Sequence, residues 1–187
     1  RKDGSYFEAE FQIRSTGRRL DSRELASIRA TLDEMILDSA DDPMFFVTKE
    51  GPVQGGWDLQ LGSKSMARMW SRKLINRFGG TSKETSTVIG VKDGAEVTRL
   101  TLSYRKPAFS IGDVMRHREE NWVVVGWQKD GPILGSMKGN KRTGRTWRDM
   151  QKSSVICSVS DQIAVQILDK DGSAADVMIP DEWKLTT

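Results

Sequence analysis

A short segment of eleven residues, 138–148, is rich in positively charged side chains. The segment 138–148 carries five cations, no acid and three turn-forming residues. Guanidinium and ammonium groups on a flexible backbone suit phosphate oxygens, since such contacts need charge and donor geometry rather than one base sequence. Trp147 lies in the same segment and has two possible roles, stacking on a base or packing in a core. We expect Trp147 to be mostly structural and the cations to bind RNA; they are Lys138, Lys141, Arg142, Arg145 and Arg148.

A second group of cations is predicted to lie on a helix that begins after Ser63. Lys64, Arg68 and Arg72 recur at a spacing of four residues, which places them in one line on a helical face. No acid occurs within residues 64–77. Two interpretations stay open. The line contacts RNA, or it is a solvated face whose counter-charges come from a neighbouring element such as the acid-rich first helix.

Side chains suited to catalysis are few. His117 is the only histidine and Cys157 the only cysteine. Nucleophilic catalysis needs a nucleophile, a base and a group that orients the base. Ser110 and Asp113 are close to His117 in sequence, but they belong to a predicted opening turn of a barrel. We therefore expect an exposed His117 at a strand end, a small buried Cys157, and no catalytic residue, metal site or cofactor in this chain.

The composition permits a nucleic-acid-binding protein without requiring one. The 187 residues, 37% of them hydrophobic, can form one or two domains with real cores. The net charge of +3 is only mildly basic, so local clusters must carry the electrostatic argument. A single cysteine excludes an internal disulfide and fits a reducing compartment, and no apolar run of about 18 residues predicts a membrane span. We expect a cytoplasmic protein.

The first half of the chain alternates strands and helices. Residues 6–14 show the period-two pattern of a half-buried strand, and residues 22–38 carry one apolar stripe behind a capping box of Asp21 and Glu24. Asp93-Gly94 is a strong hairpin signal. The order β-α-β-β-α-β-β predicts a ferredoxin-like α/β sandwich with an added strand for residues 1–106. The remaining strands are expected at 44–48, 57–61, 83–91 and 96–105, with turns at Gly51-Pro52 and Gly55-Gly56.

Beyond Lys106-Pro107 no helical stripe occurs. Short alternating runs separated by turn residues predict an all-β unit for residues 107–187, an SH3-like barrel with an appended C-terminal hairpin. The strands are expected at 111–117, 122–127, 132–137, 145–147, 155–159, 163–169 and 175–180.

Several strings in this order resemble the family of nonsense-mediated decay protein three, the export adaptor of the large ribosomal subunit in eukaryotes. The resemblance covers nearly the whole chain and rests on colinearity. The strings are Tyr6–Arg14, Leu20–Leu25, Gly56–Ser63, Thr101–Pro107, Phe109–Val114 and Val165–Asp169.

The resemblance implies a non-enzymatic protein on the intersubunit face of the large ribosomal subunit, with a second domain similar to the hypusine-bearing translation factor. Two features of the family are missing: the paired Cys-x-x-Cys zinc motifs that precede this region, and the long C-terminal shuttling tail. This resembles a shorter, archaeal-type form from which an N-terminal zinc region is absent. The hypusine loop sequence is absent too, so no modification of Lys138 or Lys141 is expected.

The sequence therefore predicts a protein that binds rRNA and ribosomal proteins of the large subunit during subunit maturation. Two alternatives remain. One is a translation-factor-like module that binds tRNA or the ribosomal exit site, and the other is a protein-interaction scaffold. No membrane and no small-molecule substrate are expected.

Overall fold

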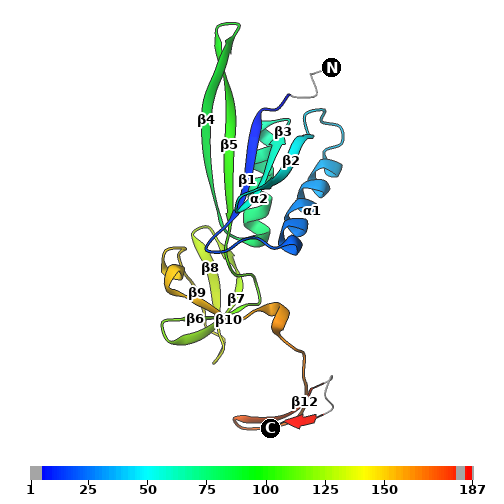
Figure 1. Ribbon diagram of the computed structural model, residues 1–187. Coiled ribbons are helices and arrows are strands. Elements are labelled where there is room, and N and C mark those ends of the chain that lie inside the picture. The colour runs from blue at the N-terminus through cyan, green and yellow to red at the C-terminus, as the bar shows by residue number, and fades with distance from the viewer. Residues whose placement is uncertain (1–5, 180–183, 187) are drawn as a thin grey trace.

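The computed structural model describes residues 6–179 and 184–186. This part of the chain is mixed α/β, with two α-helices and three β-sheets (Figure 1). The first unit runs β1 (Ala9–Ser15), α1 (Ser22–Asp38), β2 (Val47–Val53), β3 (Gly56–Leu61), α2 (Lys64–Phe78), β4 (Thr81–Lys92) and β5 (Ala95–Lys106). The observed order of strands and helices is the one that the sequence predicts.

The helix ends are set by local side chains. Asp21 accepts a hydrogen bond from the Glu24 amide at 2.8 Å, and the Glu24 carboxylate accepts one from the Asp21 amide at 3.1 Å, which completes the predicted capping box. Ser63 caps α2 by accepting a bond from the amide of Met66. Gly79 ends α2 with a φ of 74°, a conformation that favours glycine. Both helix starts are confirmed.

The first sheet has the strand order β2-β3-β1-β5-β4, and both helices lie on one face of it (Figure 1). Strand β5 lies beside β1 and is parallel to it, whereas all other pairs in this sheet are antiparallel. A plain ferredoxin-like order would bring the strand after α2 next to β1. Here β4 is the edge strand, and β5, the second strand of the β4–β5 hairpin, lies between β4 and β1. The ferredoxin-like layout is thus not confirmed in its simple form.

Strand β2 differs from the prediction because its turn residues lie inside the strand. Gly51 pairs with Asp58 and Pro52 with Trp57, so Gly51-Pro52 is part of the ladder. Pro is tolerated there because β2 is an edge strand of the sheet. The turn into β3 is made instead at Gln54-Gly55, where Gly55 has a φ of 80°.

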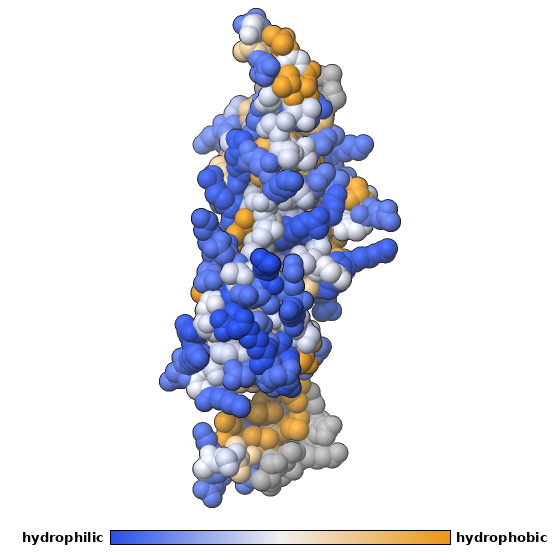
Figure 2. All heavy atoms as spheres, turned by 90° about the vertical axis from the view of Figure 1, so that its left-hand side faces the viewer, coloured by the Kyte–Doolittle hydropathy of each residue, from blue (hydrophilic) through white to orange (hydrophobic). Residues whose placement is uncertain are grey.

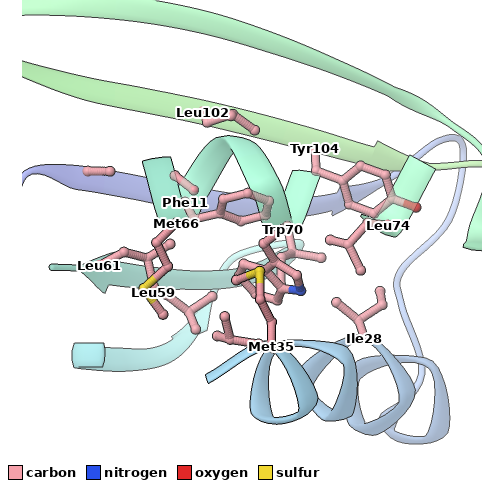
Figure 3. Packing of buried hydrophobic residues seen from close by; sticks show 14 of the residues in the cluster. Phe11, Ile28, Met35, Leu59, Leu61, Met66, Trp70, Leu74, Leu102 and Tyr104 are labelled. Atoms are coloured by element: carbon pink, nitrogen blue, oxygen red, sulfur yellow. The ribbon is translucent and has the colours of Figure 1, made fainter. Parts of the chain in front are cut away.

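The core of the first unit lies between the sheet and its two helices. Trp70 is fully buried at its centre, and its ring lies 4.2 Å from that of Phe11, centroid to centroid. The Trp70 indole donates to the hydroxyl of Thr31 on α1 at 2.9 Å. Figure 3 shows aliphatic and aromatic side chains from both helices and three strands converging on this indole. On α2, Met66, Trp70 and Leu74 are buried in this core, and Phe78 is half-buried.

The β4–β5 hairpin extends past the rest of its sheet (Figure 1). Its base pairs with β1 over residues 100–106, whereas residues 95–99 pair with β4 and with no other strand. The predicted Asp93-Gly94 turn is present, with positive φ at both residues. Apolar side chains are exposed toward this end, and they gather at the top of the face drawn in Figure 2: Val88, Ile89, Val91 and Val97.

The second unit contains an open sheet of order β10-β6-β7-β8-β9. Its strands are β6 (Val114–His117), β7 (Glu120–Gln128), β8 (Gly131–Ser136), β9 (Arg142–Gly144) and β10 (Ser154–Cys157), with 3-10 turns at Asp149–Lys152 and Val159–Asp161. None of the sheets in the described residues closes into a barrel, so the predicted SH3-like barrel is not confirmed. Strand β9 has three residues and pairs with β8 alone.

A third sheet follows, of order β11-β12-β13, with β11 (Gln166–Asp171), β12 (Ala174–Ile179) and β13 (Lys184–Thr186). The expected C-terminal hairpin is therefore present, and the sequence missed β13. Pro180, the predicted end of the second hairpin strand, lies outside the described residues.

The second unit packs on the C-terminal end of α2. Trp127 of β7 donates to the carbonyl of Arg77 at 3.4 Å. A Cβ added to Gly79 would lie 2.6 Å from the Trp127 ring, so this contact requires glycine. The second core has six buried residues, with Trp127 and Trp147 packed against it: Phe109, Met115, Trp122, Val124, Leu134 and Met150.

Candidate nucleic-acid interface

The basic segment 138–148 is a β-hairpin arm rather than one long loop. The amide of Ser136 donates to the carbonyl of Lys141 at 2.8 Å, and the Ser136 hydroxyl accepts from the amide of Lys138. Strand β9 pairs with β8 over residues 142–144. The predicted strand at 145–147 is therefore wrong by three residues. The free loop is confined to the tip, residues 137–141.

Most cations of the segment have no internal counter-charge. Lys138, Lys141, Arg142 and Arg148 are exposed, and within the described residues they form no ion pair. Arg145 differs because its side chain is half-buried and it influences two neighbours electrostatically, His117 and Asp149. Four of the five predicted contact residues are thus presented to solvent as uncompensated charges. We call them the loop cations.

Trp147 belongs to the second core. Its ring centroid lies 6.0 Å from that of Trp127 and 6.3 Å from that of Phe109. Its amide donates to the carbonyl of Asp130, which fixes the backbone beside β8. The indole nitrogen is buried and has no hydrogen-bond partner among the described residues. This placement agrees with the structural role expected for Trp147 and leaves little of the ring for stacking on a base.

The cations of α2 are not alike. Arg68 forms a bidentate ion pair with Glu84 of β4, and this contact lowers the pKa of the carboxyl group and raises that of the guanidinium group. Lys64 is half-buried and donates to the hydroxyl of Thr98 on β5 at 2.6 Å. Arg72 is exposed and forms no ion pair within the described residues. The line on α2 therefore faces the β4–β5 hairpin, and Arg68 is neutralised there.

The remaining charges of α2 are balanced by the first helix. Lys73 and Arg77 both contact the Glu34 carboxylate, at 3.1 and 3.4 Å. Hydrogen bonds from these two residues lower the pKa of Glu34. The interpretation in which counter-charges come from a neighbouring element thus holds for Lys73 and Arg77. The sequence could not decide this, because the partners are 39 and 43 residues away.

His117 is buried, not exposed as predicted. Its side chain is 3% exposed, and Nδ1 lies 2.8 Å from the hydroxyl of Ser153. Burial lowers the pKa of the imidazole, and the positive charges of Arg145 and Arg118 lower it further. The predicted exposed end of β6 is therefore covered by the segment that follows β9. Cys157 is half-buried, and its thiol donates to the carbonyl of Ser158 rather than to a base.

The helix-free face of the first sheet is polar and partly acidic. A hollow of about 310 Å³ lies there, lined in part by Glu10, Gln12, Asp58 and Gln60. Base-stacking sheets present aromatic rings on such a face. Here the outward residues of β1 and β3 are carboxylates, amides and Arg14, whose guanidinium group pairs with Asp58 at 2.6 Å. This face does not have the chemistry of a phosphate-binding surface.

No three His, Cys, Asp or Glu side chains of the described residues converge where a metal could be held. Neither described helix combines the length and apolar character that crossing a bilayer demands.

The described molecule is thus a mixed α/β protein in which three cations of α2, Arg68, Lys73 and Arg77, have carboxylate partners, whereas the loop cations have none within the described residues. Comparison with protein-family models gives a match over residues 6–105 to the NMD3 second domain, which is just over half of the chain. Comparison with curated proteins gives no match. The chain belongs to the NMD3 family, a ribosome-related family of large-subunit export adaptors.

Proposed function

We propose that this chain is a non-enzymatic protein that binds the large ribosomal subunit during its maturation, and that the loop cations contact rRNA phosphates. Family membership supports the large subunit as the partner. The observation that carries the proposal is the contrast between the two cationic surfaces. Arg68, Lys73 and Arg77 have carboxylate partners, whereas the loop cations have none within the described residues.

The contrast matters because a cation that already pairs with a carboxylate gains less free energy from contacting a phosphate than an unpaired cation does. Binding RNA with Arg68 would require breaking its contact to Glu84 or holding that carboxylate near a phosphate. An exposed cation without a partner instead releases the counterions of the phosphate it contacts. The α2 line is therefore a weaker candidate than the arm. Arg72 alone keeps the properties expected of an RNA contact.

The architecture proposed with this function has two domains, residues 1–106 and 107–187. The first is a ferredoxin-like sandwich enlarged by the β4–β5 hairpin. The second is an SH3-like unit similar to the hypusine-bearing translation factor, with a C-terminal hairpin. The separate cores on either side of Lys106 support this division.

The test compares two variants of equal charge. The loop variant carries Lys138→Gln, Lys141→Gln, Arg142→Gln and Arg148→Gln. The control variant carries the same change at four exposed residues of the first unit that form no ion pair in the described part of the chain: Arg19, Arg23, Lys49 and Lys83. Each lowers the formal net charge from +3 to −1.

Sedimentation of cell extracts then separates the candidate functions. We expect the wild-type and control proteins to travel with free large subunits and the loop variant to remain at the top of the gradient. Co-migration with translating ribosomes would favour the translation-factor alternative. Equal retention of all three proteins on large subunits would overturn the proposed site.

A further inference from the structure

The N-terminal half of α1 and the β2–β3 hairpin enclose an apolar groove, which we call the α1 groove. It consists of two hollows of about 310 and 210 Å³ that adjoin at Leu25. The smaller hollow is lined in part by the turn Gln54-Gly55 and by Arg19, Leu20 and Val53. The larger hollow is lined by Ile13, Ser22, Leu25, Ala26, Arg29 and Trp57.

The groove exists because α1 covers this end of the sheet with short side chains. Trp57 pairs across the ladder with Ile13, which is only 2% exposed on the face that carries the helices. Ser22 and Ala26 are four residues apart and therefore share one side of α1. Their side chains are too short to fill the space beside the indole. The apolar residues around the groove consequently pack against the first core and stay partly exposed: Leu20, Leu25 and Trp57.

The wall formed by Trp57 is fixed. Its indole nitrogen donates to the Glu50 carboxylate at 3.2 Å, and Nε of Arg29 donates to the same carboxylate at 3.0 Å. Arg29 also pairs with Asp33, one helical turn further on. These contacts hold the indole in one orientation before any ligand arrives, which lowers the ordering cost of binding. Arg29 itself is neutralised by them.

Two arginines at the rim have no such partner. Arg19 lines the smaller hollow, and Arg23 precedes Ala26 by three residues and therefore lies beside it on α1. Both are exposed and form no ion pair in the described part of the chain. The start of α1 adds partial positive charge. The carboxylates near the groove are already engaged, in the helix cap or in ion pairs: Asp21, Glu24, Asp33 and Glu50.

We propose that the α1 groove binds an acidic segment of a second protein, which inserts one large apolar side chain beside Trp57. Arg19 and Arg23 contact carboxylates of that segment. Two arginines alone would suit RNA phosphates as well, but the apolar hollow favours a protein. An aliphatic or aromatic side chain fills it, whereas a base would bury its polar edge without partners. The positive rim disfavours a basic segment.

The test uses the full chain and a fluorescein-labelled peptide in which one phenylalanine is flanked on both sides by glutamates. One counterpart has alanine in place of the phenylalanine, and another has lysines in place of the glutamates. Fluorescence anisotropy should show that the phenylalanine peptide binds about 10-fold more tightly than the alanine peptide, because one large apolar side chain is buried. The lysine peptide should not bind. Equal binding of the phenylalanine and alanine peptides, or no binding of either, would overturn the proposal.

A substitution that fills the groove gives an independent readout. Ala26 is exposed and lines the larger hollow, and leucine is a good helix former, so Ala26→Leu should fold normally. We expect it to weaken binding of the phenylalanine peptide about 10-fold and to leave the alanine peptide unaffected. Ser27→Leu is the control, at the next position of α1, which is exposed and lines neither hollow. Identical peptide affinities of these two variants would contradict the proposal.

The charged rim is tested by the double variant Arg19→Gln and Arg23→Gln. It should weaken binding of the phenylalanine peptide roughly 3–10-fold at low salt and flatten its salt dependence, because exposed ion pairs are modest and screened. The double variant Lys49→Gln and Lys83→Gln removes the same charge from β2 and β4 and should bind as wild type does. Displacement of the peptide from the loop variant by polyuridylate would assign the groove to RNA and overturn the proposal.

Failure of this inference is distinguishable from failure of the proposed function. The groove belongs to the first unit and the loop cations to the second, so the loop variant should keep the peptide. The Arg19 and Arg23 double variant should keep large subunits; their loss would make the subunit itself the occupant and overturn a separate partner. If the peptide fails to bind while the loop variant loses large subunits, the groove proposal fails and the function stands.

Discussion

The ammonium group of Lys106 lies 2.9 Å from Oε1 of Glu24, with only 4% of the Lys106 side chain exposed. Arg18 holds the same carboxylate in a bidentate contact at 2.6 Å and also donates to the carbonyl of Ala108. The Lys106 ammonium further donates to the hydroxyl of Ser110 at 3.3 Å. One carboxylate on α1 thus organises two cations that reach the start of the second unit.

Acid should therefore loosen this junction. Burial acts to raise the pKa of Glu24, but hydrogen bonds from Arg18 and Lys106 outweigh it and lower that pKa to about 2, from an ordinary value of 4.5. A lowered carboxyl pKa stabilises the fold above pH 4.5, and this stabilisation is lost as the pH falls from there toward 2. Thermal unfolding at pH 7 and pH 3.5 should show a smaller difference for Glu24→Gln than for wild type. Equal pH dependence in both proteins would contradict this role for Glu24.

The hydrogen bond from Trp70 to Thr31 gives a second prediction. Both residues are fully buried, so Thr31→Val leaves the indole N–H without a partner in an apolar core. The expected loss in free energy of unfolding is about 1–3 kcal/mol. Urea denaturation followed by tryptophan fluorescence measures it. Thr31→Ser keeps the hydroxyl and is the control, with a smaller loss expected from the missing methyl group. A Thr31→Val protein as stable as wild type would show that this hydrogen bond makes no net contribution to the free energy of unfolding.

The steric contact at Gly79 predicts a large effect for one added methyl group. Gly79 has a φ of 74° and packs against Trp127, whereas Gly55 has a φ of 80° and open space around it. Alanine at Gly55 strains the backbone by about 1–2 kcal/mol. The strain at Gly79 is larger, because its φ of 74° and ψ of −163° lie in a region that is essentially restricted to glycine. Gly79→Ala also meets the indole, so it should destabilise the chain by roughly 1–3 kcal/mol more than Gly55→Ala. Equal unfolding midpoints for the two variants would mean that the Trp127 ring moves aside for the added methyl group without destabilising the chain.

Buried His117 predicts a pH dependence near neutrality. Its pKa is lowered first by burial and then by Arg145 and Arg118, so the neutral imidazole is favoured in the folded state. The associated stability is present above about pH 6.5, the value of an unperturbed histidine, and is lost as the pH falls below it. Unfolding midpoints between pH 7.5 and pH 5.5 should fall more for wild type than for His117→Gln. A larger fall in the variant would reverse the assigned sign.

Local signals in the sequence were sufficient for the helices of the first unit. The Asp21–Glu24 capping box and the Ser63 cap are contacts between residues three apart, so a single sequence contains both partners. The place of β5 beside β1 was not predictable in this way. It depends on β5 pairing with β4 on one side and with β1, about 90 residues earlier in the chain, on the other. No local sequence pattern specifies the pairing with β1.

The same reasoning explains the outcome for the candidate site. The acid-free run 138–148 was visible in the sequence, but so was the acid-free run 64–77. Only the structure shows that the loop cations have no ion-pair partner among the described residues, whereas Arg68, Lys73 and Arg77 have one. The pairing of Arg68 with Glu84 joins residues 16 apart on different elements, and the burial of His117 depends on Ser153, 36 residues away.

Salt dependence tests the central claim, that uncompensated loop cations bind rRNA, most directly. The affinity for purified large subunits is measured across a salt series for wild type, the loop variant and the control variant. We expect the slope of log affinity against log salt to flatten by up to about 3 for the loop variant, as four phosphate contacts disappear, and to stay unchanged for the control. Identical slopes for all three proteins would contradict the account.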